Sequence, residues 1–144
     1  MKTPRFLLIA LAAFATPVLA QSVGPGTGDI VATLRDAGYA EVREIEFDDG
    51  VWEAEVRRAN GMWGEVSVDA ATGEVFDPLA NRPLMALPEV LAKVEAAGYH
   101  SVHDLDRDGA LWHADAIDTQ GMPVELRISG YDGRIVTVSH DHDD

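Results

Sequence analysis

A group of acidic residues in the second half of the chain has the spacing of a calcium-binding loop. Counted from Asp104, Asp106 and Asp108 fall at positions 3 and 5, Gly109 at 6 and Asp115 at 12. Oxygen ligands at 1, 3, 5 and 12 with glycine at 6 are typical of a helix–loop–helix calcium site. The residues before this stretch are typical of a helix end, however, and those after it alternate like a strand. We therefore favour a turn between two strands, and a looser cation site on Asp104, Asp106 and Asp108 is the alternative.

The C-terminal segment also offers metal ligands. His140 and His142 alternate with acidic residues in the sequence SHDHDD. Imidazole and carboxylate groups suit zinc, nickel or copper. A terminal acidic segment is ordinarily solvated, so metal capture here is again the alternative interpretation.

No pattern in the chain predicts catalysis. The sequence has no cysteine, no nucleophile elbow, no phosphate-binding glycine loop and no paired-histidine zinc motif. Ser101, His103 and Asp104 lie close together in sequence, but neighbours on one loop do not assemble a catalytic triad. We predict a protein without enzymatic activity and without a cofactor, apart from the calcium or zinc considered above.

The segment around the acidic residues has a counterpart sixty positions earlier. Residues 36–55 align with residues 96–115 without a gap, and the same offset continues downstream. The identical pairs include Gly38 and Gly98, Tyr39 and Tyr99, Trp52 and Trp112, Gly61 and Gly121, and Gly73 and Gly133. One register shared by several kinds of residue indicates a duplicated module.

Each module is expected to contain one helix followed by strands. Apolar residues first recur at helical spacing, and Gly38 and Gly98 then suit the left-handed position just past a helix end. Asp29 or Thr27 is the expected cap at the start of the first helix. The period then changes to two, as in Trp52, Ala54 and Val56, which is typical of half-buried antiparallel strands. The predicted fold class is α+β, with two tandem modules, each a helix packed on an antiparallel meander of about three or four strands.

This arrangement resembles the PepSY domain. The resemblance is carried by AGYAEVREIEF, DGVWEAEV and GEVSVDAATGEVF in the first module, whereas the second has Asp132-Gly133-Arg134 in place of Thr72-Gly73-Glu74. Two copies in tandem are also similar to periplasmic proteins described as β-lactamase-inhibitor-like. The resemblance implies a non-catalytic domain that binds and restrains a peptidase.

The N-terminus and the charge predict an exported acidic protein. Lys2 and Arg5 precede an apolar run that ends at a small-residue site before Gln21, which is typical of a secretory signal. The expected division is a signal peptide at 1–20, modules at 21–78 and 87–139, a linker at 79–86 and a tail at 140–144. The net charge of −14 disfavours nucleic acid as a partner, and no later segment is long enough to span a membrane. We expect a periplasmic or secreted location.

One strand face is the predicted binding surface. By the alternation, Trp63 lies on the face away from the helix, together with Glu53, Glu55, Arg57 and Glu65. An aromatic side chain on an open sheet face is a candidate anchor for a partner. The favoured hypothesis is a protein partner, such as a peptidase, bound at this face. The alternative is a protein that binds or senses cations.

Overall fold

Within the part of the chain that the structure describes, each half consists of one helix and a four-stranded antiparallel sheet. The structure, a computed structural model, describes residues 24–140. The first module contains α1 (Thr27–Asp36), β1 (Glu41–Asp48), β2 (Val51–Arg57), β3 (Trp63–Asp69) and β4 (Val75–Phe76). The second contains α2 (Leu87–Ala96), β5 (His100–Asp108), β6 (Leu111–Ile117), β7 (Pro123–Ser129) and β8 (Ile135–His140). Both sheets keep the strands in sequence order, which confirms the predicted α+β class.

The two helices end in the same way. Gly38 and Gly98 adopt φ of 100° and 99°, the left-handed region that glycine enters without steric cost. The amide of Tyr39 then donates to the carbonyl of Leu34 at 3.1 Å, and the amide of Tyr99 donates to that of Val94 at 3.4 Å. The predicted helix ends are confirmed.

The start of the first helix differs from the expectation. Gly26 is the residue that caps α1, so neither Asp29 nor Thr27 holds that position. Asp29 lies one turn inside the helix, and its carboxylate accepts a hydrogen bond from the Gly26 amide at 2.9 Å. The acid therefore satisfies a free amide of the helix start from within the helix.

Each sheet packs its inner face against its own helix. In the first module Ile30 and Leu34 of α1 contact Ala54, Val56, Val66 and Val68. In the second module Val90 and Val94 of α2 contact the equivalent face of β6 and β7. Trp52 and Trp112 are partly buried and pack against these clusters. The alternation of apolar residues read from the sequence therefore corresponds to the inner face of each sheet.

The acidic stretch that resembles a calcium loop is a hairpin. β5 runs to Asp108, β6 begins at Leu111, and Asp108 pairs with Leu111 across the turn. No helix enters or leaves this loop, because strands lie on both sides of it. The preferred interpretation as a turn between strands is confirmed.

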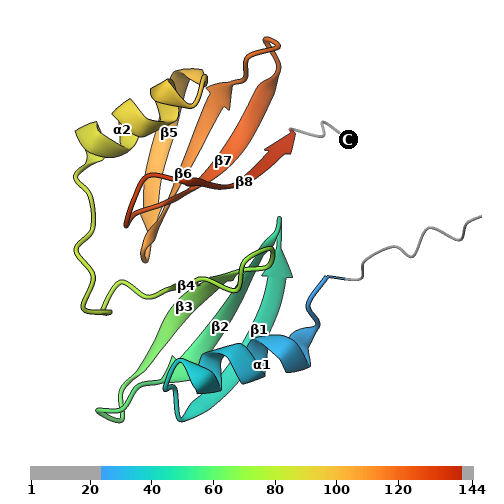
Figure 1. Cartoon of the computed structure of the whole chain (residues 1–144), viewed down its shortest axis with the longest axis vertical. Helices are drawn as coiled ribbons and strands as arrows, with labels where there is room; N and C mark the ends of the chain where they lie inside the picture. Colours follow the sequence, from blue (N-terminus) through green and yellow to red (C-terminus); the bar gives the residue numbers. More distant parts are fainter. Residues whose placement is uncertain (1–23, 141–144) are drawn as a thin grey trace, which may run out of the picture.

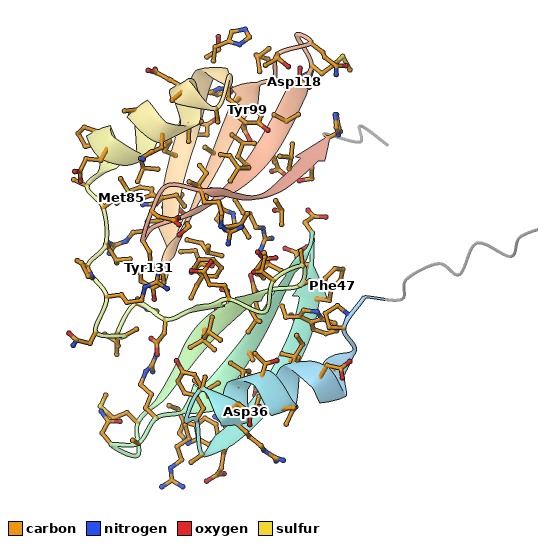
Figure 2. The ribbon with its side chains drawn as sticks, viewed as in Figure 1. Asp36, Phe47, Met85, Tyr99, Asp118 and Tyr131 are labelled. Atoms are coloured by element: carbon orange, nitrogen blue, oxygen red, sulfur yellow. The ribbon has the colours of Figure 1, made fainter. Side chains whose placement is uncertain are left out.

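The two sheets lie between the two helices. In Figure 1, α1 and α2 lie on the sides of the molecule that are farthest from the junction of the modules. The sheet faces that no helix covers turn toward each other near β4 and β8. A third apolar cluster joins the modules there, formed by Val51, Phe76, Ala110 and Leu111 with Leu84, Tyr131 and Val136. Figure 2 shows Tyr131 between the modules. Its ring stacks on Phe76 with the centroids 5.9 Å apart.

Counterpart residues of the two modules meet at this junction. Val51 and Leu111, sixty positions apart, belong to the same cluster, as do Phe76 and Val136. Arg134 occupies the place that Glu74 has in the first module, and these two side chains form an ion pair of 2.7 Å. Arg134 also reaches the buried carboxylate of Asp69 at 3.2 Å. The modules therefore contact each other through the same patch, as subunits do about a two-fold axis.

Candidate functional site

Trp63 lies at the start of β3, on the face of the first sheet that points away from α1. Strand pairing places Arg57 opposite Trp63 and Glu55 opposite Glu65, and Glu53 is two residues before Glu55 on the same face. We call this surface, made by Glu53, Glu55, Arg57, Trp63 and Glu65, the acidic face. The structure brings the five predicted residues together, and their role in binding a partner stays a prediction.

The indole ring of Trp63 is covered by a cation. The guanidinium carbon of Arg43, on β1, lies 4.0 Å from the ring centroid. Arg43 also donates from Nε to the Glu55 carboxylate at 2.8 Å. The hydrogen bond to Glu55 raises the pKa of Arg43 and lowers that of Glu55. Arg43 thus holds Trp63 and Glu55 in one cation-centred cluster. The sequence pattern did not reveal it because the register of β1 shifts between Arg43 and Glu46.

Beside this cluster the acidic face forms a shallow hollow of about 640 Å³. Four of its seven lining residues are glutamates of β1 and β2, and Glu65 of β3 adds a fifth; the lining is Glu44, Ile45, Glu46, Glu53, Ala54, Glu55 and Glu65. Burial raises the pKa of Glu65, and the nearby carboxylates of Asp108, Glu53 and Glu55 raise it further. The hollow is therefore a region of negative potential that favours a positively charged ligand.

The second module closes one end of the acidic face. Arg127 of β7 extends across the junction, where its guanidinium contacts Asp48 and lies 3.4 Å from the Glu53 carboxylate. The side chain of Arg127 is 11% exposed. The expected open sheet face is thus partly covered, and Glu53 is already engaged within the chain.

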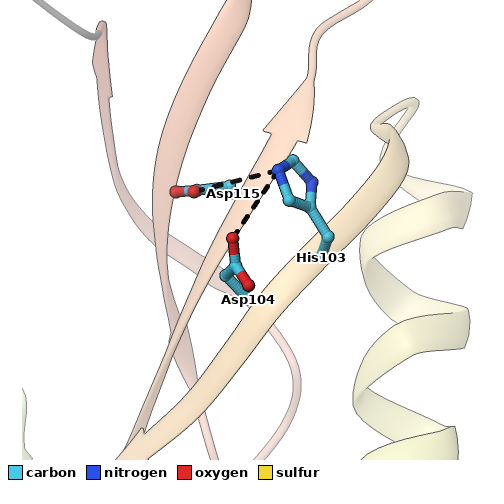
Figure 3. Close-up of side chains that lie close together, drawn as sticks. All are labelled: His103, Asp104 and Asp115. Atoms are coloured by element: carbon cyan, nitrogen blue, oxygen red, sulfur yellow. Dashed lines mark ion pairs between the residues drawn. The ribbon is translucent and has the colours of Figure 1, made fainter.

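A small cluster on the second module has the composition of a cation site. His103, Asp104 and Asp115 each offer one ligand atom, and these atoms lie within 4.8 Å of one another. Figure 3 shows both carboxylates on one side of the His103 imidazole, with Nε2 at 3.8 Å from Asp104 and 3.9 Å from Asp115. Asp104 has a φ of 49° and lies in the irregular part of β5, where the register shifts between His103 and Asp106.

The same place in the first module is occupied by an ion pair. His103 and Asp115 are the counterparts of Arg43 and Glu55, and Asp104 is the counterpart of Glu44, which also has a positive φ. A permanent cation thus neutralises the carboxylates in the first module, whereas a histidine faces them in the second. Comparing the two copies position by position would have identified His103 and Asp115 from the sequence.

The other predicted metal ligands do not join this cluster. Asp106 pairs with His113 and Asp108 with Leu111, and both lie outside the group of three. His140 ends β8, where it pairs with Val124. His142 lies outside the described residues. The metal role of all these residues stays a prediction.

Asp77 is the buried polar centre that the sequence did not indicate. Its side chain is 6% exposed and accepts hydrogen bonds from Arg58 at 2.8 Å, Tyr39 at 2.8 Å and the Leu79 amide at 2.9 Å. Its backbone carbonyl accepts from the Tyr131 hydroxyl at 2.6 Å. Burial acts to raise the pKa of Asp77, but the hydrogen bonds from Arg58, Leu79 and Tyr39 outweigh it and the net pKa is lowered. The only signal was that Asp77 interrupts the repeat, where the second copy has Thr137.

Neither helix in the described part of the chain is long and apolar enough to cross a membrane. No curated protein matches the chain. Residues 5–78, just over half of the chain, match the family described as the peptidase propeptide and YPEB domain. The match contains α1 and all four strands of the first sheet, and it ends before the second module. The chain therefore belongs to this PepSY family.

Proposed function

We propose that this is an exported, non-enzymatic PepSY-family protein that binds and restrains a protein partner such as a peptidase. PepSY domains are propeptide-like or inhibitor-like modules associated with peptidase regulation, and they are typically extracellular or periplasmic. Residues 1–20 act as the signal peptide, and the exported chain carries modules at 21–78 and 87–139, a linker at 79–86 and a tail at 140–144. This division predicts that the exported protein begins at Gln21, which N-terminal sequencing measures directly.

The acidic face supports this function better than any other surface of residues 24–140. It combines an aromatic side chain that is only partly exposed with a hollow lined by carboxylates. Tryptophan and arginine are the residues most often found at the centre of protein interfaces, and Trp63 and Arg43 are stacked here. The chemistry of the hollow requires a partner surface that carries Lys or Arg. Trp63 with its surrounding carboxylates is the single observation that carries the proposal.

The test measures inhibition of a purified zinc peptidase of the thermolysin type by the exported chain and its variants. In Trp63→Ala the apparent inhibition constant is expected to rise at least about tenfold, since an interface aromatic contributes on the order of 2 kcal/mol. Met122→Ala is the matched control, because Met122 is an exposed apolar residue in a turn of the other module. Equal inhibition by a folded Trp63→Ala protein would remove Trp63 from the interface.

A second function, cation binding, is favoured by the cluster of His103, Asp104 and Asp115. One imidazole and two carboxylates are a ligand set that suits zinc. We propose that zinc or calcium replaces here the positive charge that Arg43 supplies in the first module. A ligand at about 100 times its dissociation constant stabilises the folded state by about 2.7 kcal/mol.

The test is a thermal melt of the EDTA-treated protein with zinc or calcium added. The melting temperature is expected to rise in the wild type and in Asp106→Asn, and to stay constant in Asp115→Asn. Asp106→Asn is the matched control because Asp106 lies on the same hairpin but outside the cluster. A rise that persists in Asp115→Asn would place the cation elsewhere, and no rise with either metal would exclude the site.

A further inference from the structure

The fourth strand differs between the two modules. β8 pairs with β7 from Val124 to Ile128, whereas β4 pairs only with Ser67 and Val68 of β3. At the repeat offset, residues 64–66 are the counterparts of residues 124–126. In the part of the chain that the structure describes, residues 64–66 therefore have a neighbouring strand, β2, on one side only.

The first module lacks this strand pairing because the chain turns away after Phe76. Asp77 stands where the second module has Thr137, and its buried side chain is held by Arg58 and Tyr39. Pro78 follows, and proline has no backbone N–H to give to a strand ladder. The buried acid and the proline together direct the chain out of the sheet and leave the edge of β3 uncovered.

The peptide groups of Glu65 point toward this uncovered edge. In an antiparallel ladder, successive residues direct their N–H and C=O groups to alternate sides. The amide of Asp69 donates to the carbonyl of Glu74 on the β4 side at 2.9 Å, so Glu65, four residues earlier, faces the same way. Its counterpart Glu125 faces β8, where it pairs with Ser139. The backbone N–H and C=O of Glu65 thus point to the side on which, in the second module, the same groups of Glu125 face β8.

A groove of about 350 Å³ runs along this edge. One wall is β3 from Trp63 to Ser67, and the other is formed by Phe76, Pro78, Leu79 and the turn at Asp108 and Gly109. Leu79 is 68% exposed. The guanidinium of Arg58 lies so close to Gly64 that a β-carbon there would be 1.8 Å from it, and this guanidinium is held in place by its bond to Asp77. The groove is therefore lined by the apolar side chains of Phe76, Pro78 and Leu79, by Asp108, and by an Arg58 guanidinium that Asp77 holds in place.

The negative charge of the groove favours a positively charged ligand. Glu65 and Asp108 both line it, and no lining residue other than Arg58, which is paired with Asp77, carries a positive charge. The proximity of Asp108 contributes to the raised pKa of Glu65, after burial as the larger cause. A cationic side chain beside Glu65 would relieve this repulsion between carboxylates.

We propose that the edge of β3 from Trp63 to Val66 accepts an extended strand of a protein partner, with a Lys or Arg of that strand beside Glu65. This inference rests on the proposed function and specifies how the partner is held: main-chain hydrogen bonds extend the first sheet by one strand, as β8 extends the second. The adjoining acidic face then contacts the rest of the partner.

Two synthetic peptides based on β8 test the proposal. The first contains residues 138–140 of β8, which pair with the counterparts of residues 64–66, with Ser139→Lys and two alanines added at each end; lysine then stands where Ser139 pairs with Glu125, the counterpart of Glu65. The second carries Ser139→Glu and is otherwise identical. With fluorescent labels and the full exported chain, the lysine peptide is expected to bind at least about tenfold more tightly than the glutamate peptide. In the Glu65→Lys protein this preference is expected to reverse.

Amide exchange identifies where the peptide binds. In the free protein the Glu65 amide is expected to exchange with solvent much faster than the Glu125 amide, because only Glu125 has a strand beside it. The lysine peptide should slow exchange at Glu65. Glu65→Pro, which removes the edge-facing N–H but no bond to β2, should weaken binding about tenfold or more.

Failure of both peptides to bind would overturn the proposal, and so would three further results. They are equal affinity for the two peptides, binding without slower exchange at Glu65, and a concentration-dependent dimer that Glu65→Pro abolishes, which would assign the edge to a second copy of this chain. If the folded protein inhibits a peptidase but binds neither peptide, strand acceptance fails while the proposed function stands. If the wild type prefers the lysine peptide and Glu65→Lys prefers the glutamate peptide, but no peptidase is inhibited, strand binding at this edge is confirmed. The partner is then a protein other than a peptidase.

Discussion

Replacing Asp77 by alanine is expected to destabilise the protein more than a typical surface substitution. The change removes the acceptor for Arg58, Tyr39 and the Leu79 amide at once. It leaves the Arg58 guanidinium, whose side chain is 12% exposed, without its carboxylate. Truncating one partner of a buried pair costs far more than the pair itself contributes, because an uncompensated charge stays buried.

The expected loss in free energy of unfolding is about 3 to 5 kcal/mol. For a protein of this size that corresponds to a fall in melting temperature of about 10 to 20 °C. Because the pKa of Asp77 is lowered in the folded protein, its stabilisation is complete above the ordinary carboxyl pKa of about 3.9. It is lost as pH falls through the lower pKa of the folded state, so the difference from wild type should shrink below about pH 4.

Urea and thermal denaturation of matched variants measure this effect. Glu41→Ala is the control, because it breaks an ion pair with Arg57 in which both side chains are about half exposed, and such a pair is worth about 1 kcal/mol or less. Adding Arg58→Met to Asp77→Ala should restore part of the loss, since the unpaired buried charge is removed. A melting temperature within about 2 °C of wild type for Asp77→Ala would refute the assignment of Asp77 as a buried structural centre.

Two further predictions concern backbone strain and surface charge. Gly38→Ala should cost about 1 kcal/mol from its positive φ alone, because its β-carbon would meet nothing within 4 Å, whereas in Gly98→Ala that atom would lie 2.7 Å from Cγ2 of Thr119. Urea unfolding should show a larger loss for Gly98→Ala, and the two losses should become equal in a Thr119→Ser background. The raised pKa of Glu65 favours the folded state below the ordinary glutamate pKa of about 4.3, and this contribution is lost as pH rises through the folded pKa. Glu65→Gln should therefore raise the melting temperature at pH 7 and leave it unchanged near pH 4, and an equal effect at both values would contradict the shift.

The repeat made most of the fold predictable. A single offset of sixty aligned the helix ends, the hairpins and the inner-face residues, so one pattern such as Trp52, Ala54 and Val56 located the equivalent strand in both copies. The relative placement of the modules was not predictable in this way. It depends on contacts such as Tyr131 with Asp77 and Arg127 with Glu53, which join residues that share no local pattern.

The candidate site was predictable where alternation determines it. The face that carries Trp63 and Glu65 follows from the two-residue period of a strand, and the structure places both residues on it. The covering of Trp63 by Arg43 depends instead on the irregular pairing in β1, where the register shifts between Arg43 and Glu46. A shift of this kind changes which side chains meet, and the sequence carried no turn or glycine signal for it.

The ion pair between Glu74 and Arg134 favours contact between one first module and one second module. Because counterpart patches face each other, two first modules meeting in the same way would oppose Glu74 to Glu74, and two second modules would oppose Arg134 to Arg134. Both like pairings repel, whereas the mixed pairing gives an ion pair of 2.7 Å. One acidic and one basic residue at the same repeat position thus favour contact between the two different copies over contact between two identical ones.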